Sequence, residues 1–187
     1  MTQPGDVRVL FVCTANECRS PFAAALAQRR ALGLPVTFDS AGVEAWRRPV
    51  PETGIRHARE LGLDLSAHVS TTVHPDFLDE YDLVLGLARN HVRELATLDP
   101  AIGFRLFTLK QFAAWARDHP RPSGVDVRAW LRAQSPSASR ARILSSDRGD
   151  DVEDPVNRPI EDWRAMSADL IPAIDSLVSG LFPEAGA

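Results

Sequence analysis

The feature that most restricts the fold of this 187-residue sequence is a regular alternation of short apolar segments with longer amphipathic ones. The apolar segments are rich in Val, Leu and Phe, and they predict buried strands at 7–12, 36–39, 81–87 and 104–109. Helical periodicity predicts helices at 22–32, 52–63, 90–98, 111–115 and 160–181. Strands that alternate with helices indicate an α/β fold with a doubly wound parallel sheet. Pro172 lies inside the last helix, where we expect a kink or a break.

The length suits a single domain over 1–187 that carries an elaboration. Residues 117–150 are rich in Arg, Pro and Ser and have few large apolar residues. We interpret this segment as a surface insertion, mostly a solvated loop with one short helix.

Composition excludes several classes of protein. A net charge of -4 disfavours general nucleic-acid binding, and no apolar segment approaches the ~20 residues that cross a membrane. Met1–Asp6 lacks the basic and apolar regions of a signal peptide. We therefore expect a cytoplasmic protein with no membrane insertion and no nucleic-acid partner.

Both cysteines of the sequence, Cys13 and Cys18, lie in the loop after the first predicted strand. Two cysteines cannot form a disulfide scaffold. Parallel α/β proteins bind ligands beyond the carboxyl ends of their strands, where this loop lies. The loop ends at Ser20-Pro21, a pair typical of a helix start, and backbone N–H groups at helix N-termini bind anions.

The side chains of this loop suit a nucleophile inside an anion-binding cradle. The helix N-terminus and Arg19 favour the thiolate form of Cys13. The Arg19 guanidinium can bind two phosphate oxygens at once, and Ser20 can donate its hydroxyl to the sulfur. Asn16 tolerates the left-handed backbone that a tightly curled loop needs.

Residues 12–21, VCTANECRSP, resemble the signature of the low-molecular-weight protein tyrosine phosphatases. Further matches follow in chain order at Asp39-Ser40-Ala41-Gly42, Trp46, Ser66-Ala67-His68 and Val152-Glu153-Asp154-Pro155. The resemblance implies a four-stranded parallel sheet flanked by helices, with flavodoxin-like winding.

The resemblance also implies phosphomonoester hydrolysis through a cysteinyl-phosphate on Cys13. Arg19 binds the phosphoryl oxygens, and Asp154 acts as general acid and then as general base. The implied reaction needs no cofactor and no metal. The phosphate-binding residues implied by the match are Thr14, Ala15, Asn16, Glu17, Cys18 and Arg19.

Supporting, redox and substrate-cleft roles follow from the same resemblance. Cys18 is a candidate to trap an oxidised Cys13 as a reversible disulfide. The residues implied to support the loop are Asn16, Ser20, Ser40 and His68. The residues implied to line the substrate cleft are Glu17, Trp46, Val156 and Asn157. We expect the remaining histidines to be structural residues, namely His57, His74, His91 and His119.

The sequence departs from the family pattern at the cleft. Val156 and Asn157 stand where aromatic residues usually follow the Asp-Pro pair, and Trp163 is more typical of a helix core residue than a replacement. Glu17 stands where the family usually has a small apolar or hydroxyl residue. Some relatives act on phosphoarginine, and a carboxylate at the rim could face a guanidinium group.

The leading hypothesis is a cytoplasmic phosphatase of bacterial signalling that acts on phosphotyrosine in proteins, with a tyrosine kinase as a candidate partner. Three alternatives stay open: a phosphoarginine phosphatase, an arsenate reductase of the same fold, and a weakly active phosphate-binding relative. The sequence does not give the oligomeric state.

Overall fold

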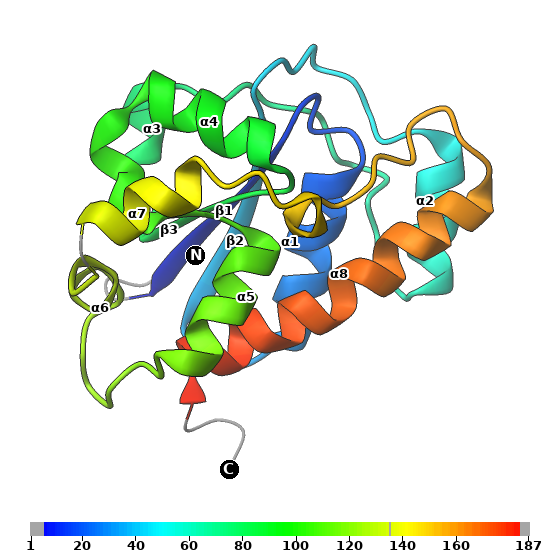
Figure 1. Cartoon of the computed structure of the whole chain (residues 1–187). Helices are drawn as coiled ribbons and strands as arrows, with labels where there is room; N and C mark the ends of the chain where they lie inside the picture. The colour runs from blue at the N-terminus through cyan, green and yellow to red at the C-terminus, as the bar shows by residue number, and fades with distance from the viewer. Residues whose placement is uncertain (1–5, 135, 184–187) are drawn as a thin grey trace.

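The computed structural model describes residues 6–134 and 136–183, so Met1–Gly5 of the segment examined for a signal peptide lies outside the described residues. It contains a four-stranded parallel sheet with the strand order β2-β1-β3-β4 (Figure 1). The strands are β1 (Val7–Cys13), β2 (Val36–Gly42), β3 (Leu83–Gly86) and β4 (Leu106–Thr108). The predicted α/β fold is therefore confirmed.

Helices cover both faces of the sheet (Figure 1). The α-helices are α1 (Arg19–Arg30), α2 (Glu52–Glu60), α3 (Pro75–Leu78), α4 (Arg89–Leu98), α5 (Leu109–Asp118), α6 (Val127–Arg132), α7 (Pro136–Ile143) and α8 (Ile160–Leu181). Two 3-10 helices are η1 (Pro100–Arg105) and η2 (Arg148–Asp150). Within the described ranges, no helix combines the length and the apolar character that crossing a membrane requires.

The alternating side chains of β1 build two separate cores. Val9 and Phe11 point to the face that α1, α5 and α8 cover. Leu10 and Val12 point to the opposite face and pack with residues of α3, α4 and η1. Because both faces of β1 are buried, its sequence is a continuous apolar run, as is typical of a central parallel strand.

The expectation of a mostly solvated loop at 117–150 is wrong. The segment contains α6 and α7, and Val127, Trp130 and Leu131 are buried in the core beside α5. The Trp130 ring packs edge-on against the Phe112 ring, with 6.0 Å between the centroids. The few large apolar residues of the segment are spaced at i, i+3 and i+4, which places them on one helix face.

The expected break at Pro172 is absent, because α8 runs as one helix from Ile160 to Leu181. Proline removes one backbone hydrogen bond from the helix interior. Leu170 and Ile174 are fully buried on either side of Pro172, so core packing holds the helix together across it.

The buried position of α6 predicts a large effect of Trp130→Ala on stability. Removing this indole from the core should lower the free energy of unfolding by about 3–5 kcal/mol. Leu144→Ala is the matched control, because Leu144 lies in the same segment and is 63% exposed. That change should cost less than about 0.5 kcal/mol. Urea unfolding monitored by circular dichroism measures both values, and equal small effects would contradict the core assignment.

Candidate active site

The site is built at the carboxyl end of β1, where the chain turns into α1 (Figure 1). Cys13 ends β1, and its Sγ lies 3.0 Å from the Ser20 Oγ. The Asn16 N–H donates to the same sulfur at 3.3 Å. The sulfur therefore lies inside the curl of the loop, within hydrogen-bond distance of one backbone N–H and one hydroxyl.

Asn16 holds the curl of the loop. Its φ is 55°, in the left-handed region that asparagine tolerates best among residues with a side chain. Its fully buried side-chain NH₂ donates at 2.9 Å to both the Ser20 Oγ and the Ser40 Oγ. Its Oδ1 accepts the Thr71 N–H at 2.9 Å, and its backbone oxygen lies 2.7 Å from the His68 Nε2. The structure therefore brings Asn16, Ser20, Ser40 and His68 together.

The loop also needs a glycine beside it. A Cβ on Gly42 would lie 2.5 Å from the Thr14 carbonyl oxygen and 2.9 Å from the Asn16 nitrogen. Those contacts are with backbone atoms, so a larger residue would push the loop out of position. The N–H groups that follow Gly42 tie down the loop, since Val43 donates to the Cys13 oxygen at 3.0 Å and Glu44 donates to the Thr14 oxygen at 2.9 Å.

Arg19 and Asp154 face each other across the site. The Arg19 Nη2 donates to the Asp154 Oδ2 at 2.6 Å, and the side chains are 9% and 36% exposed. The same nitrogen reaches the Thr14 Oγ1 at 3.4 Å, while the Nη1 donates to the Val152 oxygen at 3.4 Å. Arg19 is thus held at the edge of the loop, next to a carboxylate from a distant segment of the chain.

The segment that carries Asp154 is anchored by Asp151 and Val152, which contact the start of α4 and the residue Leu87 just before it. The Asp151 carboxylate accepts the backbone N–H of Arg89 at 2.8 Å and two donors of its guanidinium at 3.0 and 2.7 Å. The Arg89 guanidinium lowers the pKa of Asp151. A carboxylate at the start of a helix also interacts favourably with the helix dipole. The Val152 N–H then donates to the Leu87 oxygen at 2.8 Å.

His91 contacts the loop, although sequence reasoning assigned it only a structural role. It is fully buried on α4, and its Nε2 lies 3.0 Å from the Thr14 Oγ1. Burial, with the nearby Arg19 charge, lowers the pKa of His91 to about 3. The imidazole is therefore neutral at physiological pH. Nothing in the sequence marks the contact, because the two residues are 77 positions apart.

Cys18 is a buried free thiol in the same loop, and Cys13 is also a buried free thiol. Burial raises the pKa of Cys18, and the nearby Asp154, Cys13 and Glu17 raise it further. Cys18 is consequently protonated across the physiological range and is a poor nucleophile beside Cys13.

The four residues predicted to line the substrate cleft differ in their exposure. Trp46 is 72% exposed, whereas Val156 is half-buried and packs against the core. Asn157 is exposed and has a φ of 57°. The Glu17 side chain is half-buried and makes no hydrogen bond or ion pair within residues 6–134 and 136–183. Trp163 is a core residue, 1% exposed and packed against the Phe22 ring.

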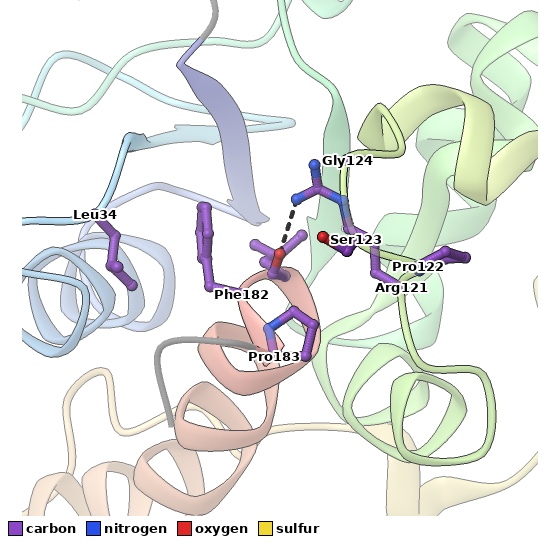
Figure 2. Close-up of a pocket in the computed structure, with 8 residues that line it drawn as sticks. Leu34, Arg121, Pro122, Ser123, Gly124, Phe182 and Pro183 are labelled. Carbon is purple, nitrogen blue, oxygen red and sulfur yellow. Dashed lines mark hydrogen bonds between the residues drawn. The ribbon is translucent and has the colours of Figure 1, made fainter. Parts of the chain in front are cut away.

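A separate pocket of about 250 Å³ lies at the other end of the sheet, beside the end of α8 (Figure 2). Leu34, Phe182 and Pro183 line it together with Arg121, whose Nη1 donates to the Leu181 oxygen at 2.8 Å. It contains no residue of the Cys13 loop and belongs to a different part of the molecule.

In the described part of the chain, no group of three or more His, Cys, Asp or Glu residues is arranged to hold a metal ion.

The lowered pKa of His91 predicts a specific loss of stability in acid. Its folded pKa of about 3 lies below the ordinary value of 6.5, so only the unfolded chain binds a proton between them. This contribution is fully present above 6.5 and is lost as the pH falls, by about 2 kcal/mol between pH 7 and pH 5. His91→Gln should lose correspondingly less stability over the same interval in chemical unfolding. An equal loss in both proteins would contradict a neutral, buried His91.

Comparison with known proteins gives consistent matches. The sequence model of the family "Low molecular weight phosphotyrosine protein phosphatase" matches residues 8–123, more than half of the chain. A protein-arginine-phosphatase of Geobacillus stearothermophilus is 31% identical over 178 residues, which cover 95% of this chain and 97% of that protein. An arsenate reductase of Bacillus licheniformis is 37% identical over 123 residues, which cover 65% of this chain and 81% of that protein.

Solved structures agree with these sequence matches. The low molecular weight protein tyrosine phosphatase from T. tengcongensis superposes with a TM-score of 0.70 at 30% sequence identity, over 93% of this chain and 99% of that chain. The family match and the near full-length relative lead to one conclusion. This chain belongs to the low-molecular-weight phosphotyrosine protein phosphatase family.

Proposed function

We propose that this protein is a cysteine-dependent phosphatase of phosphoproteins that works through a cysteinyl-phosphate on Cys13. One observation carries the proposal: the Cys13 sulfur receives the Asn16 N–H and contacts Ser20, while Arg19 and Asp154 lie together at the loop edge. Nucleophile, anion-binding loop, guanidinium and acid are the complete set of groups that phosphoryl transfer needs.

In the first step the Cys13 thiolate attacks phosphorus, and the bond to the leaving group breaks with its electron pair on that group. Asp154 donates a proton to it. In the second step Asp154 takes a proton from water, the water oxygen attacks phosphorus, and the sulfur leaves as thiolate. The Arg19–Asp154 ion pair must open when the substrate binds, because the phosphoryl oxygens compete for the guanidinium.

Glu17 favours phosphoarginine over phosphotyrosine as the substrate. Its half-buried carboxylate has no ion-pair partner among the residues that the structure describes, so it repels a phosphoryl group unless the substrate brings a positive charge of its own. A phosphorylated guanidinium carries such a charge and a phenol does not. The Geobacillus stearothermophilus relative that spans 95% of this chain is named a protein-arginine-phosphatase, which supports the same choice. Phosphotyrosine is the second candidate, favoured by the exposed ring of Trp46.

The other two alternatives are less well supported. Thiol relay in an arsenate reductase requires cysteines beyond the nucleophile loop, and the sequence has only Cys13 and Cys18. A pure phosphate-binding protein needs neither a nucleophile nor an acid, yet Cys13 and Asp154 both lie at the site. We further propose that the protein acts on phosphoproteins in the cytoplasm. If the substrate is phosphotyrosine, a tyrosine kinase is a candidate partner. We also propose that Cys18 protects an oxidised Cys13 by forming a reversible disulfide with it.

Substitution of the nucleophile and the acid tests the proposed reaction. Cys13→Ser should abolish hydrolysis of an aryl phosphate, and Asp154→Asn should lower kcat by about 10²–10⁴-fold. Cys18→Ser is the matched control, because it changes the neighbouring thiol and should keep most of the activity under reducing conditions. Full turnover by folded Cys13→Ser would exclude the cysteinyl-phosphate route.

Substitution of Glu17 tests the substrate. Glu17→Gln removes the charge and keeps the shape, so kcat/KM for a phosphoarginine peptide should fall roughly fivefold while that for a phosphotyrosine peptide rises. Glu17→Ile should shift the ratio of the two values in the same direction. The phosphoarginine assignment fails if wild type prefers phosphotyrosine and neither variant changes the ratio.

A further inference from the structure

The only lysine of the chain has a special position. The sequence contains 21 Lys and Arg residues, of which Lys110 alone is lysine. Lys110 lies in the first turn of α5, where the positive end of the helix dipole disfavours a cation. A single ammonium group at an unfavourable helix end needs a compensating set of contacts.

Two contacts compensate Lys110, and one of them is on the segment that carries Asp154. The Lys110 Nζ donates to the backbone oxygen of Asp151 at 2.9 Å. It also pairs with the Asp169 Oδ2 of α8 at 2.7 Å. The side chain is 24% exposed, so both contacts are partly shielded from water. The Lys110 Nζ therefore connects α5 with both α8 and the segment that carries Asp154.

The path from this contact to Asp154 is short. Asp151 is fixed by Arg89 on its side chain and by Lys110 on its backbone oxygen. The next residue, Val152, is buried, and its backbone oxygen accepts the Arg19 Nη1 at 3.4 Å. With the backbone held at these positions, Asp154 reaches the Arg19 guanidinium. A shift of about 1 Å in a catalytic group can cost about 10²-fold in rate.

We propose that Lys110 is a positioning residue that sets the place of the Asp154 carboxyl for proton donation to the leaving group. This inference rests on the proposed function. Lysine suits the task because its compact ammonium can meet a carbonyl and a carboxylate in different directions. The guanidinium of arginine is longer and planar, so Lys110→Arg would move the donor nitrogens relative to these two oxygens.

Leaving-group dependence tests the proposal. Phenolate is a stronger base than p-nitrophenolate, so phenyl phosphate depends more on the acid than p-nitrophenyl phosphate does. Lys110→Met should lower kcat/KM about tenfold for phenyl phosphate and less than about twofold for p-nitrophenyl phosphate. Lys110→Arg should give a smaller change in the same direction. The ratio of the kcat/KM values for the two substrates, measured on one sample, is independent of the fraction of folded enzyme.

Two further proteins serve as controls. Asp169→Asn removes the ion pair with α8 and leaves the Asp151 contact, so it should keep the wild-type substrate ratio. In the Asp154→Asn background, Lys110→Met should cause no further change in the ratio, because the acid is already gone. An equal loss with both substrates, or an additional change in that background, would overturn the positioning role. Absence of turnover in wild type would instead contradict the proposed function.

Discussion

The left-handed backbone at Asn16 is the constraint on which the site depends. At φ 55° the chain curls so that the Asn16 N–H points at the Cys13 sulfur. Such a conformation costs about 1 kcal/mol or more and persists only where its surroundings enforce it. The buried Asn16 amide makes three hydrogen bonds, to Ser20, Ser40 and the Thr71 N–H. Three segments of the chain, which contribute Ser20, Ser40 and Thr71, thus hold the loop in its curled shape.

A second set of contacts connects this loop to the segment that carries Asp154. Asp151 caps α4 through Arg89, and α4 also carries His91, which contacts Thr14 in the loop. Asp150 belongs to the same system, since its carboxylate accepts the Gln111 side chain at 2.8 Å. Asp150 and Asp151 therefore anchor the segment that leads to Asp154.

The elements predicted from the sequence are those with a local signal. Strong apolar periodicity gave the four strands and α8, and the motif around Cys13 gave the loop. Residues such as Thr71, His91 and Lys110 matter through contacts made across the fold, which no local pattern reveals. The loop prediction for 117–150 is wrong because the segment has many arginines and few large apolar residues, so its composition hides the helical spacing of Trp130 and Leu131.

The central claim is that the phosphoryl group is transferred to the Cys13 sulfur. Mass spectrometry can detect this covalent intermediate directly. Acid quenching of the enzyme during turnover of a phosphorylated peptide, followed by mass spectrometry of its fragments, locates any bound phosphoryl group. We expect one phosphoryl group on the peptide that contains Cys13, and more of this adduct in Asp154→Asn, because loss of the general base slows the attack of water. Turnover without any adduct at Cys13, or with the phosphoryl group on another residue, would contradict it.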